Sequence, residues 1–529
     1  MDLKQQLDET RLQAMEGMDI PWMLEQAVCR SPDKPCLIWE PFEGDSSTLS
    51  YRELQLKARQ LGRGLFNLGV REGDFVILHM VNSPEFVISW YACAELGAVA
   101  VSTNTRSVAR DLKYFSRHTE AVCAITQPSF SELIYNSCED ISLLIVTDND
   151  AGQAAAVPEH VECIPFDEVY DTERSLPALS RNPQRNLSVQ FTSGTTSRPK
   201  AVLWTHANGV WAGKLSASHL GLRFDDVTLV FMPLFHVNAQ GYSMLATHWS
   251  GGTMVLQPKF SASRFWPLSL KYKVTWASSI PFVLQALSKH PVPQHSYRFW
   301  GPGGNFTEYF PKFNVPMLGW WGMTEILTQG IVADVHHLGP TGTIGRAADE
   351  YEIQIRSDDG SLIRPGESGL LFIRGVRGVS MFKEYYKNSK ATEDSFDVDG
   401  WFETGDIIRM DADGWLFFVN RAKDMLRVGA ENVASSEIES VIQSSGLVEE
   451  CAVVGQPHSM LEEVPVAFVI PLKDTNVYEL RSRIISVCSE NLADFKVVRD
   501  VHVVESLPRS TIEKVAKNAL RERLPKIEV

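Results

Sequence analysis

The sequence predicts an α/β protein with more than one domain, and three observations lead to this fold class. Its 529 residues exceed what one hydrophobic core usually serves. Helix-like and strand-like stretches alternate along the first third, which favours helices layered on a largely parallel sheet. From residue 340 the residue pattern changes: turn clusters follow one another at short intervals, which indicates a small antiparallel β region.

The first third supplies the alternation. Its predicted elements are a helix over 51–68, a strand over 75–80, a helix over 85–96 and strands over 98–102, 123–125 and 143–146. The longest apolar stretch, 86–102, is interrupted by Glu95 and Gly97 and is too short to span a bilayer. We therefore expect a buried helix that turns into a strand there, and no membrane span.

The second half predicts a change of architecture and a domain boundary. Apolar runs between its turn clusters predict strands over 353–355, 370–373 and 415–419. A helix over 437–444, a strand over 451–454 and a helix over 479–491 then return the pattern to mixed α and β. We place the boundary near residue 420, with domains over 1–420 and 421–529.

Composition excludes some classes of protein. A net charge of −15 argues against a general nucleic-acid binder, because no excess basic surface is available for phosphates. The eight cysteines show neither CxxC nor zinc spacing, so we expect mostly buried free thiols in a reducing compartment. No apolar signal core follows the polar start, so the sequence predicts a cytoplasmic protein.

The stretch FTSGTTSRPKAV, residues 191–202, predicts a phosphate-binding loop. Short Ser, Thr and Gly side chains let a ligand approach backbone N–H groups, and Lys200 adds positive charge. A flexible surface linker is the alternative. Strand-like flanks at 187–191 and 202–204 favour a turn between two strands instead. A Walker loop is a poor fit because Pro199 and Ala201 flank the lysine.

Further motifs follow this loop in a fixed order. They are WGMTE at 321–325, GWFETGD at 400–406, RAKD at 421–424, GAENV at 429–433 and PRSTIEK at 508–514. In this order and spacing the chain resembles the adenylate-forming superfamily of acyl-CoA synthetases, peptide-synthetase adenylation domains and firefly luciferase. The resemblance covers about residues 25–522, and the loop and the segment 260–266 resemble the crotonobetaine/carnitine-CoA ligase branch.

The resemblance implies a fold and a reaction. The large domain would hold two layered α/β subdomains and a β-barrel-like subdomain over about 340–420, and a small mobile domain would swing about a hinge near Lys423. ATP and a carboxylic acid would give an acyl adenylate and pyrophosphate, and the CoA thiol would then displace AMP. The implied cofactors are ATP or AMP, CoA and Mg²⁺, and the implied assembly is a monomer or homodimer.

The resemblance also assigns residues to the nucleotide and to CoA. The positions near the nucleotide are Thr192, Ser193, Gly194, Thr195, Thr196, Lys200, Gly301, Gly303, Gly304, Trp320, Trp321, Gly322, Met323, Asp406 and Arg421, and Gly429 and Ala430 face CoA. Glu325, after Thr324, matches the magnesium carboxylate, with Thr196 as a second ligand. Asp406 suits the two ribose hydroxyls because a carboxylate accepts two O–H donors. Taken alone, a surface position is the alternative for Glu325 and for Arg421, and a turn-capping position is the alternative for Asp406.

The remaining assignments concern the acid and the catalytic lysine. His236 matches a position that gates the acyl pocket, and a core histidine is the alternative. The substrate pocket would be lined by His236, Val237, Asn238, Gln240 and Gly241, whose small and polar side chains leave room for a bulky or partly polar acid. Lys514 matches the lysine that bridges the substrate carboxylate and the α-phosphate, and a solvated helix lysine is the alternative.

One departure from the family pattern bears on function. Glu513 stands where the family has Gly before the catalytic lysine, and its charge is placed either to pair with Lys514 or to repel ATP and the acid. The main prediction is an acyl-CoA ligase. The alternatives are an enzyme that mainly forms thioesters from preformed acyl adenylate, a carrier-protein-loading ligase, a luciferase-like oxygenase and a nucleotide-binding regulator without turnover.

Overall fold

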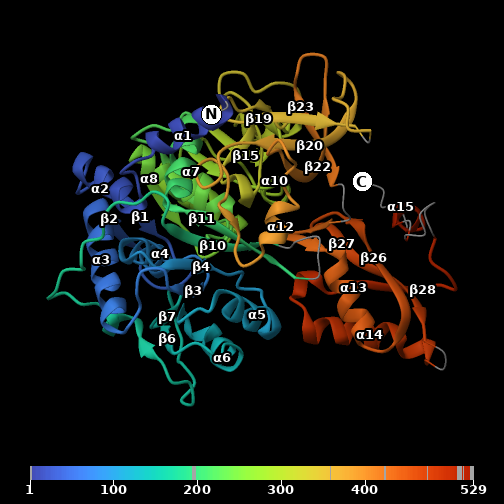
Figure 1. Ribbon diagram of the computed structural model, residues 1–529, viewed down its shortest axis with the longest axis horizontal. Helices are drawn as coiled ribbons and strands as arrows, with labels where there is room; N and C mark the ends of the chain where they lie inside the picture. The colour runs from blue at the N-terminus through green and yellow to red at the C-terminus, as the bar shows by residue number, and fades with distance from the viewer. Residues whose placement is uncertain are drawn as a thin grey trace. The chain divides into compact units, whose positions relative to one another are not determined.

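Two large sheets carry most of the first 420 residues (Figure 1). The computed structural model describes residues 3–192, 198–357, 359–421, 425–429, 431–472, 475–508, 515 and 517–524. Contacts divide the chain into two units, the first comprising Met1–Thr105, Leu112–Phe191 and Ala201–Asn420, and the second Arg106–Asp111, Thr192–Lys200 and Arg421–Val529. The predicted mixed α/β class is confirmed.

The nine-stranded sheet has the order β18-β17-β16-β15-β14-β12-β13-β1-β2. Its strands are β1 (Pro35–Trp39), β2 (Ser47–Ser50), β12 (Val227–Val230), β13 (Thr253–Leu256), β14 (Trp276–Ser278), β15 (Phe299–Gly303), β16 (Met317–Gly322), β17 (Gln329–Val332) and β18 (Arg346–Ala347). Strands β1, β13, β12, β14, β15 and β16 pair in parallel with their neighbours. Strand β2 pairs antiparallel at one end of the sheet, and β17 and β18 pair antiparallel at the other. Parallel strands end at one edge, which in α/β sheets is where ligands bind.

The eight-stranded sheet has the order β21-β11-β10-β4-β3-β5-β6-β9. Its strands are β3 (Phe75–His79), β4 (Val99–Ser102), β5 (Cys123–Thr126), β6 (Leu143–Val146), β9 (Ile164–Pro165), β10 (Asn186–Thr192), β11 (Lys200–Thr205) and β21 (Glu384–Tyr385). The predicted strands of the first third are therefore confirmed. All five residues of β3 are buried, which explains its continuous apolar run.

Helices cover these sheets, and several of them begin at capping residues. They include α1 (Leu3–Ala14), α2 (Ile20–Arg30), α3 (Tyr51–Asn67), α4 (Pro84–Leu96), α5 (Ala109–Thr119), α6 (Pro128–Ser137), α7 (His206–His219), α8 (Ala246–Ser250), α9 (Ala262–Lys271) and α10 (Pro281–Ser288). Ser50 and Glu53 form a capping box at α3. Helix α4 starts after Ser83 and ends at Gly97, whose φ of 78° is left-handed. It lies beside α3 and is buried along its length, as predicted.

The region after residue 340 is a small antiparallel sheet of order β19-β20-β22-β23. Its strands are β19 (Glu352–Arg356), β20 (Ser368–Arg374), β22 (Phe402–Met410) and β23 (Leu416–Arg421). The three strands predicted there are thus confirmed, the last displaced by one residue. The segment 148–158 contains a short hairpin of β7 (Asn149–Asp150) and β8 (Gln153–Ala154).

The second unit packs helices on a five-stranded sheet. Four strands have the order β25-β24-β27-β26, and β28 pairs with β27 in parallel. The elements are β24 (Met425–Val428), β25 (Glu431–Ala434), α13 (Ser435–Ser444), β26 (Val448–His458), β27 (Glu462–Pro471), α14 (Val477–Asn491), β28 (Asp500–Val503) and α15 (Lys517–Arg521). Helices α13 and α14 lie side by side against these strands (Figure 1), around a separate apolar core.

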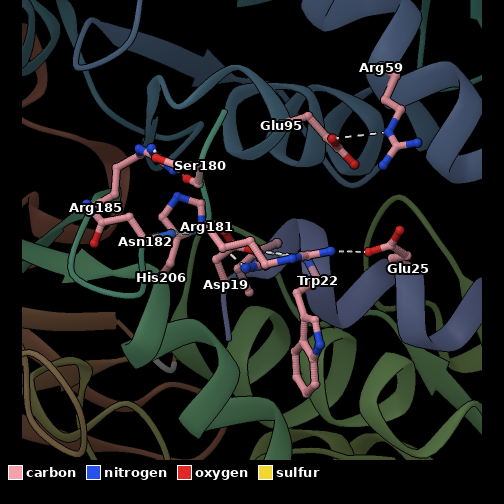
Figure 2. Close-up of polar contacts among 11 residues, drawn as sticks. Asp19, Trp22, Glu25, Arg59, Glu95, Ser180, Arg181, Asn182, Arg185 and His206 are labelled. Atoms are coloured by element: carbon pink, nitrogen blue, oxygen red, sulfur yellow. Dashed lines mark hydrogen bonds and ion pairs between the residues drawn. The ribbon is translucent and has the colours of Figure 1, made fainter. Parts of the chain in front are cut away.

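A polar cluster ties α2 to the segment that leads into β10 (Figure 2). Asp19 caps α2 by accepting from the Trp22 backbone N–H at 2.9 Å. The Arg181 guanidinium forms ion pairs with Asp19, at 3.3 Å, and with Glu25. His206 Nδ1 accepts from the backbone N–H of Ile20 at 3.2 Å. These contacts fix the chain where it enters β10, the strand that leads to the predicted phosphate loop.

The cysteines and the helices agree with two further predictions. All eight cysteines are free, and five of them are buried. Burial raises the pKa of the Cys93 thiol to about 12, so that side chain stays protonated at neutral pH. Of the helices in the described ranges, none is both long and apolar enough to cross a bilayer.

Candidate active site

The carboxyl edge of the nine-stranded sheet carries several glycines in the segment 301–304, whose surroundings differ. Gly303 ends β15 with a φ of 94°, and no atom lies within 4 Å of the place where its Cβ would be. At Gly301, by contrast, a Cβ would lie 1.6 Å from the Trp320 ring. Gly303 therefore leaves the edge open, and Gly301 makes room for the Trp320 indole.

Two predicted nucleotide residues meet although 85 positions separate them. Trp321 Nε1, on β16, donates to Asp406 Oδ2, on β22, at 2.8 Å. Both side chains are buried, with exposures of 7% and 2%. The backbone N–H of Asp406 also donates to Thr404 Oγ1 at 3.1 Å. The indole N–H thus orients the carboxylate, a function that the sequence analysis did not assign to Trp321.

Glu325 lies on a one-turn 3₁₀ helix, η4 (Thr324–Ile326), and is 5% exposed. The Tyr385 hydroxyl donates to Glu325 Oε1 at 2.9 Å. Burial, together with the nearby Glu325 charge, raises the pKa of Tyr385 well above its usual value. The hydroxyl therefore keeps its proton and remains a donor to the carboxylate.

The phosphate loop connects neighbouring strands, as predicted. Thr192 is the last residue of β10 and Lys200 the first of β11, and these strands are adjacent in the eight-stranded sheet. Strand β11 pairs antiparallel with β21, with Val202 opposite Tyr385. The loop's second strand therefore runs beside the tyrosine that holds Glu325. Ser193, Gly194, Thr195, Thr196 and Ser197 lie outside the described residues.

The predicted acyl pocket lies at the start of a π-helix, η2 (Asn238–Leu245). His236, Val237 and Asn238 are half-buried, and Asn238 Oδ1 accepts from the Ser278 hydroxyl at 2.6 Å. Asn238 therefore lies beside the end of β14, whose last residue is Ser278.

The last two predicted pocket residues are interior. Gln240 is fully buried, donating to Leu234 O at 3.2 Å and accepting from Gln190 Nε2 at 2.7 Å. A Cβ at Gly241 would lie 2.7 Å from Leu327 O. Gln240 and Gly241 are therefore packed against the protein interior within the first turn of the π-helix.

Residues predicted near the hinge and the CoA site are only partly described. Arg421 ends β23, and its side chain is not among those described. Gly429 turns the β24–β25 hairpin with a φ of 56°, and its N–H donates to Leu461 O at 2.9 Å. Lys423, Ala430, Glu513 and Lys514 lie outside the described residues.

Sequence reasoning missed four aromatic residues around Glu325. Tyr385 binds the carboxylate, and Trp204 Nε1 donates to Thr324 O at 3.0 Å. Tyr351 donates to Ile326 O at 2.9 Å. Tyr242 is 3% exposed, and its hydroxyl has no hydrogen-bond partner among the described residues. Isolated aromatics give no local signal, because only the fold brings them to η4.

Within the described ranges, no three His, Cys, Asp or Glu side chains converge as a metal site.

Two layered α/β sheets, a small β-rich region and a separate α+β unit define the class of adenylate-forming enzymes. The chain belongs to the AMP-binding enzyme family: residues 24–386 match its main domain, and residues 437–514 match the AMP-binding enzyme C-terminal domain.

Relatives and solved structures resemble the chain over nearly its whole length. It is 33% identical to the crotonobetaine/carnitine–CoA ligase of Proteus mirabilis, covering 92% of this chain and 96% of that one, and 32% identical to the Salmonella agona protein of that name, covering 96% and 99%. An o-succinylbenzoate CoA synthetase of Bacillus subtilis superposes with a TM-score of 0.80 at 27% identity, over 95% of this chain and 98% of that one. The chain is an AMP-forming acyl-CoA ligase.

Proposed function

We propose that this ligase converts a short carboxylic acid carrying a polar group into its CoA thioester. We assign Trp320, which the resemblance placed near the nucleotide, to the acyl side instead, because its ring fills the space over Gly301 and would limit the size of an acyl group there. Half-buried His236 and Asn238 favour a polar substituent. The names of the curated relatives agree, because crotonobetaine and carnitine are short, polar acids.

The first half-reaction joins two anions. A carboxylate oxygen attacks the α-phosphorus of ATP, the bond to pyrophosphate breaks, and the acyl adenylate forms. Asp406, oriented by Trp321, would accept the ribose O–H groups, while Thr192, Lys200 and the loop between them would bind the triphosphate. Fixing both reactants in this way removes much of the entropic barrier.

The residues present fit a magnesium ion beside the triphosphate. Glu325 would hold it with phosphate oxygens, because its carboxylate is buried and already oriented by Tyr385. Bound Mg²⁺ would neutralise charge on the phosphates. Lys514 would bridge the substrate carboxylate and the α-phosphate, completing the donors aimed at developing charge.

The second half-reaction exchanges oxygen for sulfur. The CoA sulfur attacks the acyl carbonyl carbon, the C–O bond to AMP breaks, and the thiol proton is released. The segment around Gly429 would face CoA after the C-terminal unit rotates about Lys423. Support for this movement comes from the division of contacts at Asn420 and Arg421, and from two family matches separated by residues 387–436.

A screen of acids tests the proposed substrate class. Short polar acids, short apolar acids and long-chain acids are compared by CoA-thioester formation with ATP and Mg²⁺. The proposal expects the highest kcat/KM with short polar acids. A preference for long-chain acids would contradict the role given to Trp320. Product analysis with a holo-carrier protein separates a ligase for CoA from one that loads carriers.

Glu513 favours a second candidate, an enzyme with weak adenylation that uses acyl adenylate supplied to it. A negative charge beside Lys514 would repel both anionic substrates of the first half-reaction. Acid-dependent pyrophosphate exchange is measured separately from thioester formation with synthetic acyl adenylate. Robust exchange rejects this candidate, and exchange restored by Glu513→Gly supports it.

A further inference from the structure

The backbone just after Glu325 is strained. Leu327 has φ 69° and ψ −33°, a combination that residues with a side chain rarely adopt. The N–H of Thr328 donates to Ile326 O at 2.7 Å, which closes a tight turn centred on Leu327. Such strain persists only where the surroundings hold it in place. The question is therefore which groups hold this turn.

Three successive carbonyl groups before the turn are each held by a distant segment. Trp204 Nε1 donates to Thr324 O at 3.0 Å, and the Phe382 N–H donates to Glu325 O at 2.8 Å. The Tyr351 hydroxyl lies 2.9 Å from Ile326 O. We call Trp204, Tyr351 and Phe382 the η4 cradle. Together these donors leave the backbone carrying Glu325 little freedom.

Tyr351 is central to the η4 cradle because its hydroxyl connects three elements. It lies 2.9 Å from Ser380 O as well as from Ile326 O, and it accepts from Trp211 Nε1 at 3.3 Å. Its side chain is 4% exposed, and burial raises its pKa above the usual value, so it stays a donor. The hydroxyl thereby joins α7, η4 and the 376–381 turn.

The opposite side of the strained turn is held by close packing. The Leu327 carbonyl lies where a Cβ on Gly241 would be only 2.7 Å away. Leu327 itself is fully buried. The turn therefore has no space to relax toward η2, and the hydrogen bonds of the η4 cradle prevent movement in the other direction.

We propose that Tyr351 is a positioning residue for adenylation: it holds the strained turn and so keeps the Glu325 carboxylate aimed before ATP arrives. The inference rests on the proposed role of Glu325 beside the triphosphate. Tyr351 itself contacts neither substrate. Its effect is confined to the half-reaction that uses Glu325.

The test is Tyr351→Phe, which keeps the ring and removes the donor. Acid-dependent pyrophosphate exchange is expected to fall by about tenfold or more and to need a higher Mg²⁺ concentration, since small misplacements are costly. Thioester formation from synthetic acyl adenylate is expected to change less than about twofold. Tyr51→Phe is the matched control, because the Tyr51 hydroxyl is equally buried and donates to Gly252 O at 2.7 Å, away from η4.

The outcomes separate the inference from the proposed function. Equal loss of both half-reactions, or no loss of exchange, in Tyr351→Phe would overturn the positioning role. If Glu325→Gln retains full exchange, the proposed role of Glu325 fails and this inference fails with it. If Glu325→Gln is inactive and Tyr351→Phe is normal, only the inference fails. If Tyr351→Phe does not fold, Trp204→Phe is tested instead, because it removes the neighbouring donor of the η4 cradle. The same result is expected of it: a loss of pyrophosphate exchange without a matching loss of thioester formation from acyl adenylate.

Discussion

The proposed nucleotide side and the proposed acyl side of the site are built differently. On the nucleotide side, Glu325 and Asp406 are nearly inaccessible, and each accepts a hydrogen bond from a buried aromatic side chain. On the acyl side, His236, Val237 and Asn238 are half-buried at the start of a π-helix. The carboxylates of the nucleotide side are therefore fixed before a ligand arrives, whereas the acyl side has partly exposed side chains that a ligand would contact.

Because of this difference, substitutions on the two sides should have different effects on activity. A buried carboxylate with a fixed donor contributes the same geometry to every reaction cycle, whichever acid is bound. Half-buried side chains contact the variable part of the substrate. We therefore expect changes on the nucleotide side to alter the rate with all acids, and changes on the acyl side to alter the ranking of acids.

The largest expected effect comes from Glu325→Gln. Removing the charge should lower acid-dependent pyrophosphate exchange by about 100-fold or more, because the charge proposed to bind the cation is lost. The loss should be the same for every acid tested. Glu384→Gln, on the same strand as Tyr385, is the control. A loss confined to one class of acid would contradict the assignment of Glu325 to the nucleotide side.

Tyr385→Phe should have the next largest effect, about tenfold on exchange, because Glu325 loses its hydroxyl donor. The raised pKa of Tyr385 adds a pH test. Its hydroxyl stays protonated at and above the usual tyrosine pKa of about 10, so the ratio of wild-type to variant rates should stay constant from about pH 6 to 9. A ratio that collapses within that window would show that the hydroxyl ionises there.

Trp320→Leu tests the acyl side and should change the ranking of acids. Removing the ring opens space over Gly301, so kcat/KM should shift by about tenfold in favour of longer acids. The KM for ATP should stay within about twofold. Thermal unfolding measured in parallel accounts for the stability lost with a buried indole. An unchanged acid profile would place Trp320 outside the pocket.

Trp321→Phe should give the smallest effect, and it tests whether Trp321 acts on the nucleotide side. The variant keeps an aromatic ring but loses the N–H that donates to Asp406. The net contribution of a hydrogen bond is about 1 kcal/mol, so the KM for ATP should rise about fivefold with every acid. Steady-state kinetics with two dissimilar acids checks this. A rise with only one of them would assign Trp321 to the acyl side.

The sequence by itself determined the α/β class, most of the elements and the order of the motifs. Patterns such as the buried run of β3 or the polar loop after β10 report on local backbone, so they can be read without the fold. Side-chain chemistry also indicated that Asp406 and Glu325 suit a nucleotide and its cation.

Only the tertiary structure decided how these residues are held. Trp321 reaches Asp406 across 85 positions, and Tyr385 reaches Glu325 across 60. Trp204 and Tyr351, which secure η4, have no local signature, and neither does the burial of Gln240 within η2. The physical reason is that strand order and packing decide which distant side chains become neighbours, and a single sequence does not specify that pairing.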